Sequence, residues 1–245
     1  TATGQDKVKE GYSPLPAGFS SLPYNSKEAL ASIDLDKTVA VMLEVVQGEG
    51  GVIPADPTFV EEVAQLCKDK GILLIVDEIQ TGIGRTGKKF GFEHYGIEPD
   101  IFTLAKGLGN GMPVGAMVAK EKYQSHFGPG SHGSTFGGNP IAMAAAKAVL
   151  TTVFDETFLQ AATEKGNYLA EKLEAEIANL PIVKEVRQKG LMVGIECTDK
   201  VGEFIPKMLE RGLMAIVAGE KVIRLLPPLT TTTEEIDQAV QIIKE

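Results

Sequence analysis

The stretch Ile72-Leu73-Leu74-Ile75-Val76-Asp77-Glu78 places five consecutive apolar residues directly before two carboxylates. An apolar run without alternation is typical of a strand that is buried on both faces of a parallel sheet. Ligands of such sheets bind beyond the carboxyl ends of the strands, which is where Asp77 and Glu78 stand. The stretch therefore predicts an α/β fold with a ligand site at this end of the strand.

The residues before this strand predict the rest of a βαβ unit. Asp56-Pro57 offers an N-cap carboxylate and a proline at the first helical position, and Gly71 ends the helical pattern. The apolar run 39–46 predicts the strand that precedes this helix. Strand, helix and strand with short connections favour a mainly parallel sheet. Two more strands are expected at 100–105 and 114–119, and a helix at 140–153.

We expect two domains in these 245 residues, a larger α/β domain over 1–153 and a smaller α+β domain over 154–245. The second region begins with a long helical pattern over 158–179. Strands are expected at 182–187, 191–197 and 222–226, and a helix at 201–211. A capping box, Thr232-Thr233-Glu234-Glu235, predicts a last helix.

The composition excludes several classes of protein. The chain carries 24 basic and 33 acidic residues, a net charge of −9, which argues against binding to nucleic acid or to an anionic membrane. No apolar run approaches the ~18 residues of a membrane span. The two cysteines, Cys67 and Cys197, predict neither a disulfide framework nor a metal site, and favour a reduced, cytoplasmic setting.

Two residues at predicted strand ends are candidates for chemistry. A carboxylate such as Asp77 at the end of a buried strand needs a cationic partner to stay ionised, and its alternative role is to cap the loop at Thr81-Gly82. Lys106 follows the run 101–105 and precedes a glycine-rich loop. If both strands belong to one sheet, Lys106 lies near Asp77 and is a candidate nucleophilic amine. Its alternative is a solvated surface lysine.

Two further features suggest anion binding. Strand alternation puts Arg224 on the face of Val222 and Leu226, where its planar fork suits a carboxylate, whereas on an edge strand it would lie in solvent. The loop 131–140 contains Ser134 and Thr135, whose hydroxyls suit an anion such as phosphate.

A nucleotide-binding alternative comes from Gly82 to Lys89, which nearly fits the ATPase phosphate loop. Lys89 stands where a hydroxyl must bind Mg²⁺, and the stretch does not lie between its own strand and a helix. Both facts oppose the ATPase interpretation.

Taken together, the motifs resemble those of the class III, pyridoxal-phosphate-dependent aminotransferases, which implies the aspartate-aminotransferase-type fold (fold type I). The resemblance covers essentially the whole chain. Its motifs are Gln47-Gly48-Glu49-Gly50-Gly51, Asp77 to Gly82, Gly84-Arg85-Thr86-Gly87, Lys106-Gly107, His132 to Pro140, and Arg224 with Pro227-Pro228.

Within that group, Gly51 to Ala55 and Gly111 to Ala116 resemble the acetylornithine aminotransferases. That implies transfer of the ω-amino group of N-acetylornithine to 2-oxoglutarate, a step of arginine biosynthesis. Ornithine, succinylornithine and 4-aminobutyrate aminotransferases share most of these motifs and remain alternatives. A catalytically inactive fragment or assembly partner is another.

The resemblance also implies roles for single residues around the cofactor. Lys106 resembles the lysine that binds pyridoxal phosphate covalently and moves the substrate proton, and Asp77 would pair with the pyridinium nitrogen. Ile79 would pack on the ring, and Gln80 would reach its hydroxyl. Thr135 resembles the residue that binds the phosphate in the neighbouring subunit, which implies a homodimer.

Substrate contacts follow from the same resemblance. Ser134 would touch the substrate, and Arg224 would bind the α-carboxylate of glutamate or 2-oxoglutarate. Glu49 would pair with Arg224 when the other donor binds. The family's phosphate loop, ring-stacking aromatic and acetylornithine-binding arginine precede the position that matches Thr1. We therefore expect that an N-terminal part of the large domain is missing and that residues 1–245 alone lack transaminase activity.

Overall fold

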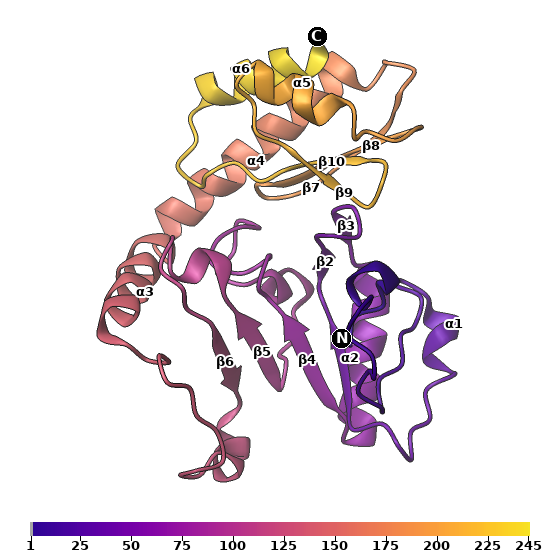
Figure 1. The fold of residues 1–245 in the computed structure, drawn as a ribbon, viewed down its shortest axis with the longest axis vertical. Helices are drawn as coiled ribbons and strands as arrows, with labels where there is room; N and C mark the ends of the chain where they lie inside the picture. The colour runs from indigo at the N-terminus through magenta and orange to yellow at the C-terminus, as the bar shows by residue number, and fades with distance from the viewer. Residues whose placement is uncertain (1) are drawn as a thin grey trace.

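The computed structural model describes residues 2–245, which form two four-stranded sheets, one two-stranded hairpin and the helices arranged around them (Figure 1). The first sheet has the order β1 (Ala40–Leu43), β4 (Leu73–Asp77), β5 (Ile101–Leu104) and β6 (Ala116–Ala119). The pairs β1–β4 and β4–β5 are parallel, and β6 is antiparallel to β5. The expected mainly parallel α/β sheet is confirmed.

Helix α2 (Pro57–Lys70) covers this sheet as its sequence predicts. The Asp56 carboxylate accepts hydrogen bonds from the N–H groups of Thr58 and Phe59, at 2.8 and 3.1 Å. Gly71 ends the helix with a φ of +67°, a conformation that glycine adopts without strain. The apolar face of α2 packs against β4, with Val60, Val63, Leu74 and Val76 in one core.

The run 39–46 forms two strands instead of the single strand expected. After β1, the carbonyls of Glu44 and Val45 accept hydrogen bonds from the Tyr24 and Tyr95 hydroxyls. The chain then turns into β2 (Val46–Gln47), which pairs antiparallel with β3 (Ile53–Pro54). We call the connection 48–52 the hairpin tip. It projects toward the second sheet (Figure 1).

Two long helices lead into the second sheet: α3 (Pro140–Val153) and α4 (Glu156–Ile177). Near its start, α4 packs Leu159 against Ile83 and Val153 of the first half, and near its end it packs Leu173 and Ile177 against the second sheet. Helix α4 contributes to the hydrophobic cores of both halves of the molecule. The expected domain boundary at 153/154 therefore stays a prediction.

The second sheet is antiparallel, with the order β7 (Val183–Lys189), β8 (Met192–Cys197), β10 (Val222–Leu225) and β9 (Ile216–Ala218). Helices α4, α5 (Phe204–Glu210) and α6 (Thr233–Lys244) cover the face that points away from the first sheet (Figure 1). Thr232 and Glu235 form the expected capping box of α6. Strand β9 has only three residues and was not predicted.

The remaining elements are short: η1 (Asp6–Val8), α1 (Lys27–Leu30), η2 (Gly91–Tyr95), η3 (Lys106–Leu108) and η4 (Glu121–His126). Within residues 2–245, no helix has the length and hydropathy that a bilayer crossing requires.

Candidate active site

The carboxyl ends of β4 and β5 bring Asp77 and Lys106 to the same edge of the first sheet. Asp77 is in register with Thr103 of β5, and Lys106 follows three residues later at the start of η3. Lys106 has a φ of +44°, which is uncommon for a residue with a side chain and often marks a functional position. Its side chain is exposed. The two strands that carry these residues are thus neighbours in one sheet, as expected.

Asp77 caps the turn that directly follows it, at Ile79 and not at Thr81-Gly82, where the alternative role predicted the cap. One carboxylate oxygen accepts a hydrogen bond from the Ile79 N–H at 2.9 Å, which caps the following turn. The other oxygen accepts no hydrogen bond from residues 2–245. Beside it on β5, the Thr103 hydroxyl is buried and has no partner within the same residues. Two polar groups at the strand ends are therefore free to bind a polar ligand.

The neighbouring carboxylate, Glu78, has a structural role that the sequence did not reveal. It is 1% exposed and accepts hydrogen bonds from the Thr81 hydroxyl and from the N–H groups of Gly91 and Phe92. Burial raises the pKa of Glu78 above its usual range. These contacts fix the loop that begins at Asp77.

Arg224 of β10 reaches the first half of the molecule. Its Nη1 lies 2.8 Å from Glu49 Oε1 and donates to Gln80 Oε1 at 3.2 Å, while Gln80 Nε2 donates to Glu49 at 3.3 Å. Arg224 is only 5% exposed because β10 is an interior strand, so the alternative of a solvated edge arginine is wrong. Its Nε is buried without a partner among residues 2–245, which leaves a donor for a carboxylate ligand.

Glu44 belongs to this site, although sequence reasoning missed it. It follows β1, next to the end of β4, and accepts a hydrogen bond from the Gly48 N–H at 3.3 Å. Burial raises the pKa of Glu44, the charge of Asp77 adds to that rise, and Lys106 opposes it. The available signal was its position at a strand end, the same signal that identified Asp77.

Ser134 and Thr135 do not join this cluster within the chain. Both are exposed in the segment between β6 and α3, which lies on the outer side of the first sheet (Figure 1). Ser134 accepts a hydrogen bond from the Gly137 N–H at 3.2 Å, a contact internal to the loop. Thr135 therefore does not complete the site formed by Asp77 and Lys106 of its own chain.

The segment 82–89 is not built as a phosphate loop. It leads into the short 3₁₀ helix η2, so no α-helix N-terminus faces it. Its backbone packs against the second half of the chain, where Leu191 N–H donates to Arg85 O at 3.0 Å. The guanidinium of Arg85 donates to the carbonyls of Leu191 and Pro227, and its burial lowers the pKa to about 10. The ATPase alternative is therefore wrong.

The two sheets and the polar cluster between them define an α/β protein of the aspartate-aminotransferase type, fold type I. The chain belongs to the class III aminotransferases, because the model of that family, aminotransferase class-III, matches residues 1–245.

The chain is 55% identical over all 245 residues to the acetylornithine aminotransferase of Bacillus subtilis (strain 168) and spans 63% of its length. It is similar to an ornithine aminotransferase structure from Toxoplasma gondii that has PLP at partial occupancy at its active site (TM-score 0.91, 34% identity, 98% of this chain, 58% of the other). It is also similar to the N-acetylornithine aminotransferase of Stenotrophomonas maltophilia K279a (TM-score 0.85, 32% identity, 94% of this chain, 62% of the other).

Proposed function

We propose that the protein transfers the ω-amino group of N-acetylornithine to 2-oxoglutarate with pyridoxal phosphate as cofactor. The observation that supports this most directly is the arrangement of Asp77 and Lys106 at adjacent strand ends, together with the ion pair between Glu49 of the hairpin tip and Arg224 of the second sheet. The identity of 55% to the acetylornithine aminotransferase of Bacillus subtilis supports N-acetylornithine as the donor.

The free polar groups fit the proposed cofactor. The unpaired oxygen of Asp77 suits a protonated ring nitrogen, and the exposed amine of Lys106 suits an aldehyde carbon. Ile79 and Gln80, which follow Asp77 in the same turn, would contact the ring and its hydroxyl. When bound, pyridoxal phosphate supplies an electron sink for the negative charge that forms at the substrate Cα.

The residues of this chain would divide the work of transamination. Asp77 holds a proton on the ring nitrogen by its negative charge. Lys106 removes a proton from the substrate and returns it. Arg224 binds the α-carboxylate of glutamate or 2-oxoglutarate, while Ser134 contacts substrate from the other subunit. Glu49 covers Arg224 when N-acetylornithine binds, and its half-exposed side chain is free to move away.

A homodimer is part of the proposal. Thr135 is exposed and would bind the cofactor phosphate of a second copy. The surface around it carries large exposed apolar side chains, a property of interfaces between subunits. They are Met117, Phe127, Phe136, Ile141 and Met143. The cytoplasmic setting rests on the two cysteines, which are buried and free.

Reduction with borohydride tests the proposal. After the full-length protein is loaded with pyridoxal phosphate and reduced, peptide mapping should find the pyridoxyl label on Lys106. A label on Lys88 or Lys89 would contradict the assignment. Steady-state assays with N-acetylornithine, ornithine and 4-aminobutyrate, each with 2-oxoglutarate, then identify the donor with the highest kcat/KM.

A further inference from the structure

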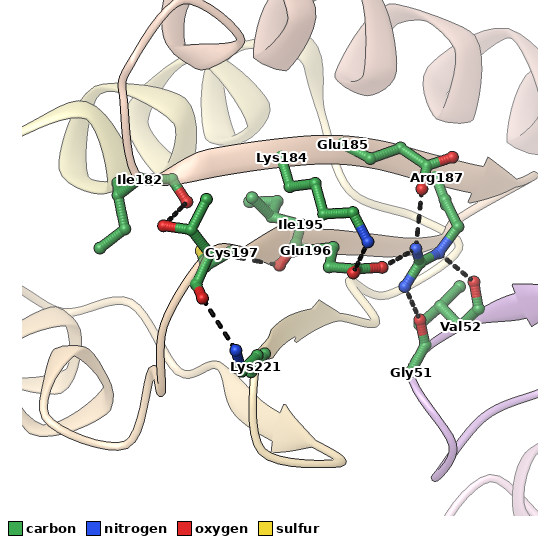
Figure 2. Close-up of polar contacts among 11 residues, drawn as sticks. Gly51, Val52, Ile182, Lys184, Glu185, Arg187, Ile195, Glu196, Cys197 and Lys221 are labelled. Atoms are coloured by element: carbon green, nitrogen blue, oxygen red, sulfur yellow. Dashed lines mark hydrogen bonds and ion pairs between the residues drawn. The ribbon is translucent and has the colours of Figure 1, made fainter.

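Arg187 of β7 holds the hairpin tip from outside the candidate site (Figure 2). Its Nη2 donates to the carbonyl of Gly51 at 2.8 Å, and its Nε donates to the carbonyl of Val52 at 3.1 Å. The side chain of Arg187 is 13% exposed. Hydrogen bonds from a charged donor are stronger than neutral ones, so this guanidinium is a firm anchor for the tip that carries Glu49.

The strand register explains why the tip is seated here. Arg187 and Arg224 both lie opposite Gly194 of β8, so the three residues form one row on one face of the second sheet. A Cβ on Gly194 would lie 2.8 Å from the Cβ of Val52. The glycine therefore provides the space for the tip, with one arginine on each side.

The seated backbone is strained. Val52 is fully buried and has a φ of +52°, which a β-branched residue rarely adopts. The two carbonyls bound by Arg187 flank the Cα of this residue. A third contact, from the Gly219 N–H to the carbonyl of Glu49 at 2.9 Å, comes from the turn between β9 and β10. The second sheet thus holds the tip at both ends of its strained segment.

Carboxylates on the sheet keep Arg187 in place. Its Nη1 pairs with Glu196 and, at 2.9 Å, with Glu185. Lys184 pairs with the other oxygen of Glu196 (Figure 2). Arg187 and Lys184 together hold the pKa of Glu196 below its usual range. The guanidinium is therefore fixed from one side while it donates to the tip from the other.

We propose that Arg187 is a positioning residue that holds Glu49 against Arg224 and so sets the balance between the two amino donors. This inference rests on the proposed function. A donor that uses its own carboxylate at Arg224 must displace Glu49, whereas the other donor needs Glu49 in place. Release of the tip would weaken the Glu49–Arg224 pair and favour glutamate over N-acetylornithine.

The kinetic test uses the full-length holoenzyme and two variants, Arg187→Lys and Arg187→Met. Lysine keeps a charge beside Glu196 but lacks the fork that spans two carbonyls. Single turnovers are measured separately with glutamate and with N-acetylornithine. We expect kcat/KM for glutamate, divided by kcat/KM for N-acetylornithine, to rise by about tenfold in both variants. That is the effect of losing one charge-assisted hydrogen bond. Lys184→Gln, the matched control, removes a partner of Glu196 that does not touch the tip, and should leave the ratio unchanged.

A second readout needs no activity. Hydrogen exchange of the cofactor-free protein should be faster in the peptide that covers 48–52 in both Arg187 variants, and unchanged in Lys184→Gln. An unchanged donor ratio, an equal fall with both donors, or unchanged exchange at the tip would overturn the inference. If the wild type transaminates neither donor, the proposed function fails, and exchange alone decides whether Arg187 holds the tip.

Discussion

Arg224 gives the sharpest prediction for a single residue. Arg224→Lys should lower kcat/KM for glutamate and for 2-oxoglutarate, because a lysine cannot bind a carboxylate through two parallel hydrogen bonds. The expected loss is about 1.5–3 kcal/mol of transition-state stabilisation, or roughly 10- to 150-fold. Steady-state kinetics with both substrates measure it. Values of kcat/KM that equal those of the wild type for both substrates would contradict the carboxylate role.

His94 predicts how stability depends on pH. Its Nε2 lies 3.0 Å from the Thr86 carbonyl, and burial, reinforced by Lys189 and Lys88, lowers its pKa from 6.5 to about 4. Between these values the unfolded chain binds more protons than the native one, so the free energy of unfolding should fall as pH falls below about 6.5 and stay level above it.

His94→Gln isolates that effect, because glutamine does not titrate and retains a donor for Thr86. Urea unfolding at pH 7.5, 6.0 and 5.0 should show a larger loss of stability in the wild type than in the variant. Glu44 and Glu78, whose pKa values are raised, titrate in both proteins and cancel in the comparison. Parallel pH profiles would show that His94 titrates normally.

Functional residues at strand ends were predictable from the sequence where consecutive strands are neighbours in the sheet. Asp77 and Lys106 follow apolar runs, and adjacent parallel strands bring their ends together. Arg187 was not predictable, because its hydrogen-bond partners are backbone carbonyls 136 and 135 positions away. Carbonyls carry no sequence signal. The residues around Arg187 predict only a strand with several charged side chains.

Among the elements, the turn between β7 and β8 packs directly against the backbone of the first half. Gly190 has a φ of +57°, and a Cβ there would lie 2.4 Å from the carbonyl carbon of Thr86. Gly190→Ala should therefore combine left-handed strain with a clash against backbone, at about 2–5 kcal/mol in all.

Gly96→Ala is the matched control, since its φ is +63° and no atom lies within 4 Å of the added Cβ. It should incur only the strain, about 1–2 kcal/mol. Urea denaturation of both variants measures the difference. Equal losses would mean that the segment 82–89 yields to the added methyl group.

Elements with caps and long apolar faces were predicted well, and short ones were not. Helix α2 carries its start and stop signals in Asp56 and Gly71, and its observed ends match them. The division of 39–46 into β1 and β2 depends on Tyr24 and Tyr95, which lie far away along the chain. Strand β9 exists because β10 offers it an edge, a tertiary cause that local patterns do not contain.

At the scale of the whole molecule, the hairpin tip joins the two sheets. Glu49 of the tip pairs with Arg224, Gly48 is bound by Glu44, and Arg187 holds the far end. A movement of the second sheet relative to the first would therefore act directly on the Glu49–Arg224 pair. The arrangement links the orientation of the two halves to the part of the site that would choose between substrates.

The proposed homodimer is tested at the exposed apolar surface around Thr135. Ile141 is 68% exposed in the first turn of α3, where an aspartate suits the positive end of the helix, so Ile141→Asp should leave the fold intact. In an interface it would leave a desolvated charge. We expect the dimer to weaken at least about 100-fold.

Light scattering during gel filtration measures the mass. Transaminase activity should decrease as the dimer dissociates, because Thr135 then no longer reaches the second copy's site. Met214→Asp is the control: Met214 is 81% exposed, before β9 and away from that surface. It should leave both mass and activity unchanged. A monomeric wild type with full activity, or an Ile141→Asp dimer as tight as the wild type, would show that this face does not join two copies.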